Sequence, residues 1–97
     1  MLRHVVVFTW QPGTTEAQLD ALRVGLARLP GQLPQIVDYR FGDDAGISEG
    51  NHAFAVTADF ASVDDYLVYR DAPVHRAVLE DLVRPIVATR AAVQFET

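Results

Sequence analysis

The segment Arg3–Trp10 constrains the fold of this chain more than any other part of the sequence. It reads RHVVVFTW, and its short length and its β-branched and aromatic residues predict a β-strand. Alternation gives this strand two apolar faces, one with His4, Val6, Phe8 and Trp10 and the other with Val5 and Val7. A strand that is apolar on both sides needs a sheet covered on both sides. We therefore expect helices on one face and another layer on the other.

Hydrophobic periodicity, capping signals and turn residues divide the rest of the chain into further elements. In chain order they are a helix that begins after Thr15 and stops at Pro30 and Gly31, strands over Ile36–Gly42 and His52–Phe60, helices over Val63–Tyr69 and Pro73–Val83, and a last strand over Arg90–Glu96. The order β-α-β-β-α-α-β predicts an α+β, ferredoxin-like fold with helices on one face of a four-stranded antiparallel sheet. In this fold we expect the first and third strands to lie side by side and parallel.

The bare face of the sheet predicts a second copy of the chain. The 97 residues (1–97) make a single domain, and 49% of them are apolar, which is high for so small a protein. Val5 and Val7 face away from the helices. In the second strand, Val37, Tyr39 and Phe41 share one face. We predict that two sheets pack face to face and form a homodimeric α+β barrel.

Composition excludes several classes of function. The net charge is −5, and no stripe of basic residues is present, which argues against nucleic-acid binding. The sequence contains no cysteine and no apolar run of membrane-spanning length, and its N-terminus runs directly into a strand. We therefore expect a soluble cytoplasmic protein that does not bind a membrane. The sequence also lacks a glycine-rich phosphate loop and a nucleophile elbow. What remains is chemistry without a cofactor, ligand binding or a structural dimer.

The break between the two last helices carries the candidate catalytic residues. His75 follows Pro73 in the first turn of a helix, where the partial positive charge of the helix disfavours imidazolium and leaves a neutral base. Tyr69 ends the preceding helix and has a hydroxyl that can hold a substrate oxygen. Structural explanations compete with both roles, since Tyr69 also suits the core and His75 also suits an exposed first turn.

Two more histidines are candidate substrate-binding residues. His4 begins the first strand and His52 begins the third, and neighbouring strands are only about 5 Å apart. On the same faces lie the apolar candidates Val6, Phe8 and Phe54. Both histidines also have a structural explanation. His4 suits a half-buried ring that is hydrogen-bonded to a loop carbonyl, and His52 suits the exposed end of a loop. The histidine spacings match no compact metal-ligand motif, so we expect no metal.

Several motifs together resemble one known family. They are the opening RHVVVFTW, LARLPGQLP at the end of the first helix, YRFGDDAG, SEGNHAF, the run DFASVDDYLVY over Asp59–Tyr69, PVH over Pro73–His75, and the closing RPIV and VQFE. Across essentially the whole chain the sequence resembles the stress-responsive α/β-barrel (Dabb) domain family of the dimeric α+β barrel superfamily. The resemblance implies a homodimer and requires no cofactor.

The resemblance also implies roles for individual residues. One plant member of the family is a polyketide (olivetolic acid) cyclase, which closes a linear tetraketide acid by aldol condensation. Its catalytic tyrosine and histidine align with Tyr69 and His75, and a pocket histidine aligns with His4. Its pocket histidine on the third strand falls on Phe54. This chain also has Ala72 where the family often has histidine before the proline.

Three functional hypotheses follow from the sequence. The first is a Dabb-type dimer that binds a small apolar or polyketide-like ligand between sheet and helices. The second is a cofactor-independent polyketide cyclase with His75 as base and Tyr69 orienting the substrate. The third is cofactor-free monooxygenase chemistry, which related dimeric barrels perform. It ranks last because such enzymes use an Asn/Trp/His pocket, and here only Trp10 and scattered partners are present.

Overall fold

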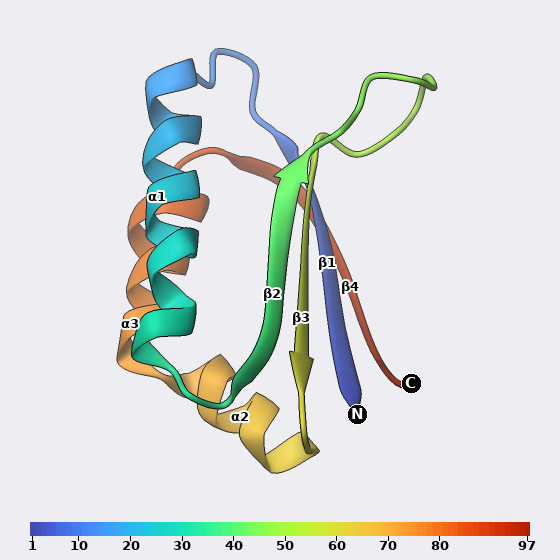
Figure 1. Ribbon diagram of the computed structural model, residues 1–97. Helices are drawn as coiled ribbons and strands as arrows, with labels where there is room; N and C mark the ends of the chain where they lie inside the picture. Colours follow the sequence, from blue (N-terminus) through green and yellow to red (C-terminus); the bar gives the residue numbers. More distant parts are fainter.

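The computed structural model describes all 97 residues and places a layer of helices against one face of a sheet (Figure 1). The elements in chain order are β1 (Leu2–Trp10), α1 (Glu16–Gln32), β2 (Ile36–Asp43), β3 (Phe54–Phe60), α2 (Val63–Asp71), α3 (Pro73–Val78), the π-helix η1 (Leu79–Val83) and β4 (Val87–Glu96). The four strands are antiparallel neighbours, and the predicted ferredoxin-like fold is confirmed. No helix is both long and apolar enough to cross a membrane.

The strand order is β2-β3-β1-β4, and β1 runs antiparallel to both of its neighbours. Leu2 lies opposite Phe60, and Phe8 lies opposite Phe54. The predicted parallel pairing of the first and third strands is therefore wrong. The reason lies in the connections, because α1 returns the chain so that β2 runs in the direction of β1. The chain then reverses between β2 and β3, which pair as antiparallel neighbours.

The two faces of the first strand are as predicted. Val6 and Phe8 are buried under the helices, whereas Val5 and Val7 are half-buried on the bare face. The core lies between the helices and the sheet, and its largest fully buried side chains are Phe54, Phe60, Leu22, Leu29 and Ile86. Dispersion and the hydrophobic effect therefore hold the helix layer on one side of the sheet only.

Helix α1 is longer than predicted. Its N-terminus is the predicted capping box, in which the Thr15 hydroxyl accepts from the Gln18 N–H and the Gln18 side chain accepts from the Thr15 N–H. The helix does not stop at Pro30, because Pro30 loses only its own N–H bond in the last turn. The Leu33 N–H still donates to the Leu29 carbonyl at 2.9 Å.

Strand β2 contains an irregularity that the sequence did not indicate. Its register against β3 shifts between Ile36 and Asp38. As a result Val37 turns outward and is 56% exposed, although we predicted it on the same face as Tyr39 and Phe41. Both aromatic residues do pack against the core.

The break between α2 and α3 is built by local sequence signals. The Ser62 hydroxyl caps α2 by accepting a hydrogen bond from the Asp65 N–H. Ala72 is extended, as the residue before a proline tends to be, and Pro73 is the first residue of α3. A π-helix then follows α3, and such wider turns are frequent at functional sites. Helix α2 packs against β1, β2 and β3, and α3 continues from it beside α1.

Strand β4 forms one edge of the sheet, and apart from the half-buried Val87 its residues are exposed. It begins at Val87, earlier than the predicted Arg90. The register against β1 places Gln94 opposite His4 and Arg90 opposite Phe8. Both side chains therefore lie on the face that carries the helices, next to the open side of the core.

Candidate functional site

A cavity of about 120 Å³ lies between the helices and the sheet. It is mainly apolar, and its polar side chains come from β1, β2, β4 and the α2–α3 break: His4, Tyr39, Tyr66, Tyr69, His75 and Arg90 among others. From the sequence we expected Tyr69 and all three histidines, His4, His52 and His75, to face one site. The structure brings His4, Tyr69 and His75 together around this cavity.

The backbone at the end of α2 fixes the ring of His75. Its Nδ1 lies 3.1 Å from the carbonyl oxygen of Arg70, and because a carbonyl can only accept, Nδ1 carries the proton. Nε2 therefore keeps a lone pair, makes no hydrogen bond to the protein and is not sealed from solvent. Only 7% of the residue is exposed, so the alternative of an exposed first-turn residue is wrong. Burial lowers the pKa of His75 against the opposing effect of the Arg70 carbonyl.

Tyr69 is both a core aromatic and a cavity residue. It is 2% exposed, and its ring centroid lies 4.0 Å from that of His75. Its hydroxyl is 2.9 Å from the hydroxyl of Tyr39. Burial raises the pKa of Tyr39 to about 12 and raises that of Tyr69 further above its ordinary value. Both phenols keep their protons near neutral pH, so Tyr69 offers a neutral hydroxyl and cannot serve as a base.

His4 is fixed from the opposite side of the cavity. Its Nδ1 lies 2.8 Å from Nε2 of Gln94, whose amide donates, and this assignment leaves the proton of His4 on Nε2. Its ring centroid is 5.1 Å from that of Tyr66 and 6.2 Å from that of Tyr69. Burial, followed by the charges of Arg90 and His75, lowers the pKa of His4 to about 4. The sequence alternative of a loop carbonyl as partner is wrong, because the partner is a side chain on β4.

The two histidines present complementary groups to the same space. Both are neutral near pH 7 because burial lowers both pKa values. His75 offers an unprotonated Nε2, which accepts a proton, and His4 offers an Nε2–H, which donates a hydrogen bond. This pair can remove a proton from carbon while it holds the neighbouring carbonyl oxygen.

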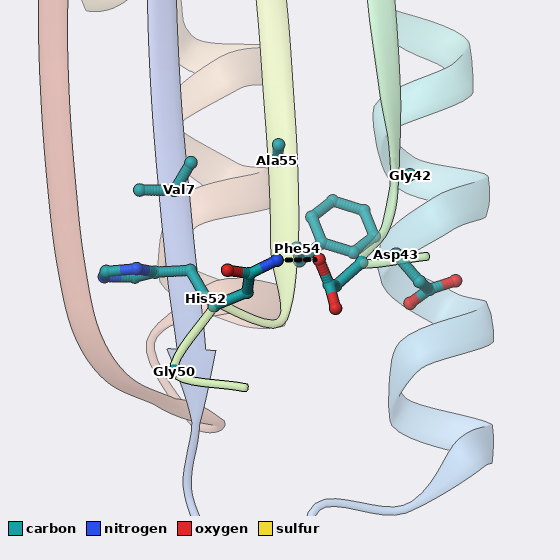
Figure 2. Close-up of a pocket in the computed structure, with 9 residues that line it drawn as sticks. Val7, Gly42, Asp43, Gly50, His52, Phe54 and Ala55 are labelled. Carbon is teal, nitrogen blue, oxygen red and sulfur yellow. Dashed lines mark hydrogen bonds between the residues drawn. The ribbon is translucent and has the colours of Figure 1, made fainter. Parts of the chain in front are cut away.

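His52 does not belong to this cavity. Because β1 and β3 are antiparallel, His4 pairs with Ala58, and His52 lies beyond the other end of β1, where the Ala53 N–H donates to the Phe8 carbonyl. Figure 2 shows His52 on the same side of the sheet as Val7, in an open pocket that includes residues of the β2–β3 loop. The predicted placement of His52 beside His4 is therefore wrong.

Of the apolar candidate residues, two line the cavity and one does not. Val6 and Phe8 line the cavity, as their face predicts. Phe54 is 1% exposed and packs against Trp10 and Phe41, and its side chain belongs to the core rather than to the cavity wall. Phe54 therefore lies outside the cavity that contains His4 and His75. No group of three or more His, Cys, Asp or Glu side chains is arranged to hold a metal ion.

Sequence reasoning missed several cavity residues. Tyr66 precedes Tyr69 by three residues and so shares its helix face, which the sequence could have shown. Gln94 and Arg90 depend on the register between β4 and β1, which no local pattern reveals. Arg76 follows His75 directly and also lines the cavity.

The comparisons with known proteins agree with this fold. A dimeric ferredoxin-like protein of unknown function from Thermobifida fusca is 38% identical, with 99% of this chain and 90% of that chain covered and a TM-score of 0.92. A Dabb family protein from Mesorhizobium loti is 22% identical, with 99% and 95% covered and a TM-score of 0.82. A hydroxynitrile lyase from Passiflora edulis is 18% identical, with 97% and 90% covered and a TM-score of 0.85.

The last two structures are similar to this chain in fold alone. No curated protein matches the sequence. The sequence model of the stress responsive A/B barrel domain matches residues 2–97, which is nearly the whole chain. Together with the relative from Thermobifida fusca, this match confirms the resemblance that the sequence motifs indicated. The chain belongs to the Dabb family, whose members carry the stress responsive A/B barrel domain.

Proposed function

We propose that this Dabb protein binds a small, mainly apolar carbonyl compound in the cavity between its helices and its sheet. The observation that carries the proposal is the pair of neutral histidines, with the free Nε2 of His75 and the Nε2–H of His4 at the same apolar space. The outer nitrogens of both imidazoles have no protein partner and are not sealed from solvent, so they are free to bond a ligand in the cavity.

The size of the cavity limits the ligand. An apolar cavity of roughly 150 Å³ accommodates benzene. The cavity of about 120 Å³ therefore suits one ring or a short alkyl chain, with the remainder of a longer ligand lying outside. The lining is mostly hydrophobic, and a few placed polar groups orient the ligand, as in other small-molecule sites.

A cofactor-independent polyketide cyclase is the second candidate, and the arrangement of His75, His4 and Tyr69 favours it. Nε2 of His75 would take a proton from a carbon between two ketones, while the Nε2–H of His4 holds the developing enolate oxygen. The carbanion would then attack a second ketone carbon of the same chain, and the imidazolium would return its proton to the new alkoxide. The neutral hydroxyl of Tyr69 would orient the chain. One such acid–base group contributes about 10²–10⁴ in rate.

The other functional alternatives receive less support. The same fold occurs in an enzyme, the hydroxynitrile lyase of Passiflora edulis, so catalysis is compatible with it. Of the Asn/Trp/His pocket expected for monooxygenase chemistry, the sequence offered only Trp10 and scattered partners. Trp10 stacks on Phe8 at 5.4 Å and does not line the cavity, which leaves that hypothesis without an observation in its favour.

We also propose that the protein is a homodimer that packs through the bare face of its sheet. This face exposes Val93 and Phe95 of β4 beside the half-buried Val5 and Val7 of β1. The relative that is 38% identical is described as dimeric. Apolar side chains on an uncovered sheet face favour association with a second sheet of the same kind.

Acetophenone is a suitable probe of the cavity, since it joins one ring to one carbonyl group. In protein with ¹³C-labelled histidines, acetophenone should shift the ring signals of His4 and His75 and leave that of His52 unchanged. If His52 alone responds, or if no histidine responds, the proposed ligand site is wrong. His52→Ala is the matched control for catalysis on a linear poly-β-ketone acid. His75→Ala should lower the formation of cyclised product about 10²–10⁴-fold, whereas His52→Ala should not.

A further inference from the structure

Three arginines have no carboxylate partner. Ion pairs hold the others: Arg3 with Asp59, Arg23 with Glu16, Asp20 and Asp43, Arg40 with Asp38, Arg70 with Asp71, and Arg84 with Glu80. Arg28, Arg76 and Arg90 make no such pair. The chain has 13 acidic and 8 basic side chains, so a shortage of carboxylates is not the reason.

Two of the three unpaired arginines, Arg76 and Arg90, line the cavity. Arg90 is on the helix-facing side of β4, opposite Phe8, and Arg76 follows His75 on α3. Both line the cavity that contains His4 and His75. Both also line an outer groove of about 310 Å³ between η1 and β4, which shares Phe8 with the cavity. Arg76 and Arg90 therefore stand where the inner cavity meets the outer groove.

The charge of Arg90 acts on the inside of the cavity. Besides burial, Arg90 contributes to the lowered pKa values of His4 and His75, and Arg76 contributes to that of His75. These effects require guanidinium charges near the imidazoles, and Arg76 also lies near enough to Asp71 to help lower the pKa of that carboxyl. The mouth of the cavity is thus positive while the histidines inside remain neutral. Such a distribution favours a ligand with an anionic group at the mouth and an uncharged body within.

We propose that Arg76 and Arg90 bind the carboxylate of a small carboxylic acid whose apolar, carbonyl-bearing end fills the cavity. This inference rests on the proposed function, because the same cavity receives the body of the ligand. The planar guanidinium group matches a carboxylate with two parallel N–H···O bonds, and it stays charged at every physiological pH. The carboxylate fixes which end of the ligand enters, so that the uncharged end reaches His4 and His75.

Benzoate and benzamide distinguish charge recognition from binding of the ring. They have nearly the same shape, and only benzoate is charged. Isothermal titration of the intact protein should give a Kd for benzoate about 10- to 100-fold lower than that for benzamide, which is the range expected of charge-assisted hydrogen bonds. Arg90→Gln and Arg76→Gln should each remove most of this preference, because each should weaken benzoate binding far more than benzamide binding. Arg28→Gln is the matched control, since Arg28 is exposed and unpaired like the other two but lies away from the cavity.

Each outcome bears on a separate part of the account. Equal affinity for the two compounds overturns the role of the arginines and leaves the ligand cavity intact. A preference for benzoate that survives both substitutions, or that Arg28→Gln removes equally, also overturns it. If neither compound binds the wild-type protein, the proposed function itself is refuted, and this inference is refuted with it. Circular dichroism of each variant verifies that the exposed substitutions leave the fold unchanged.

Discussion

Acidification below pH 6.5 should destabilise this protein through His4. An imidazole has a pKa of 6.5 in the unfolded chain, and burial lowers that of folded His4 to about 4. Between these two values the unfolded chain binds a proton that the folded protein does not. The free energy of unfolding must therefore fall as the pH falls from 6.5 to 4, and His4 makes its full stabilising contribution only above pH 6.5.

The size of the effect follows from the two pKa values. One pKa unit is worth about 1.4 kcal/mol, so the full difference corresponds to about 3 kcal/mol, of which about 2 kcal/mol is lost by about pH 5. Because the ring borders a cavity that admits solvent, screening reduces the expected loss by about pH 5 to about 1–2 kcal/mol. His75, whose pKa is also lowered by burial, adds to the loss in the same direction.

Urea unfolding at pH 7.5 and pH 5, at one fixed protein concentration, measures this loss. In His4→Gln the loss between the two pH values should be about 1–2 kcal/mol smaller than in the wild type. Gln94→Leu removes the partner of His4 but keeps the titrating ring, so the pH dependence should persist. Parallel pH profiles for the wild type and His4→Gln would show that His4 is not a buried neutral imidazole and would refute the reasoning.

Two further predictions concern the bare face and helix α1. Val93→Asp should convert the dimer to monomer in size-exclusion chromatography with light scattering, because an unpaired carboxylate in an apolar interface is costly. Val24→Asp is the control, since Val24 on α1 is 51% exposed and Val93 is 54% exposed. If both variants are monomers, the assigned interface is wrong. Gly31→Ala should raise the free energy of unfolding by about 0.5–1 kcal/mol. Gly25→Ala should not raise the free energy of unfolding in this way, because its new Cβ would lie 2.5 Å from Cδ1 of Leu82. An equal increase for both variants would contradict the close packing of Gly25 against Leu82.

Local sequence patterns predicted the layers of the fold for a physical reason. Side chains alternate along a strand, so the apolar residues of β1 had to divide between two faces, and the structure shows this division. The capping box at Thr15 and the proline at position 73 likewise act within one turn of helix. Each of these signals involves residues that are close in the sequence, and each gave the correct element.

The errors arose where distant segments meet. His52 was placed beside His4 because the direction of β3 relative to β1 was assigned incorrectly, and one reversed strand moves a residue to the far end of its neighbour. Gln94 and Arg90 reach the cavity only through the register of β4, which depends on tertiary packing. Which ring nitrogen carries the proton depends on the partner of the other nitrogen, so the complementary roles of His4 and His75 required atomic distances.

The most direct test of the account is a crystal structure of the protein with acetophenone bound. We predict the ring in the cavity beneath the helices, the carbonyl oxygen within hydrogen-bond distance of Nε2 of His4, and the adjacent methyl carbon facing Nε2 of His75. Two results would contradict the central claim that this Dabb protein binds its ligand between sheet and helices. One is a ligand found only in the open pocket beside His52. The other is a cavity filled by other side chains, with the histidine rings turned away from it.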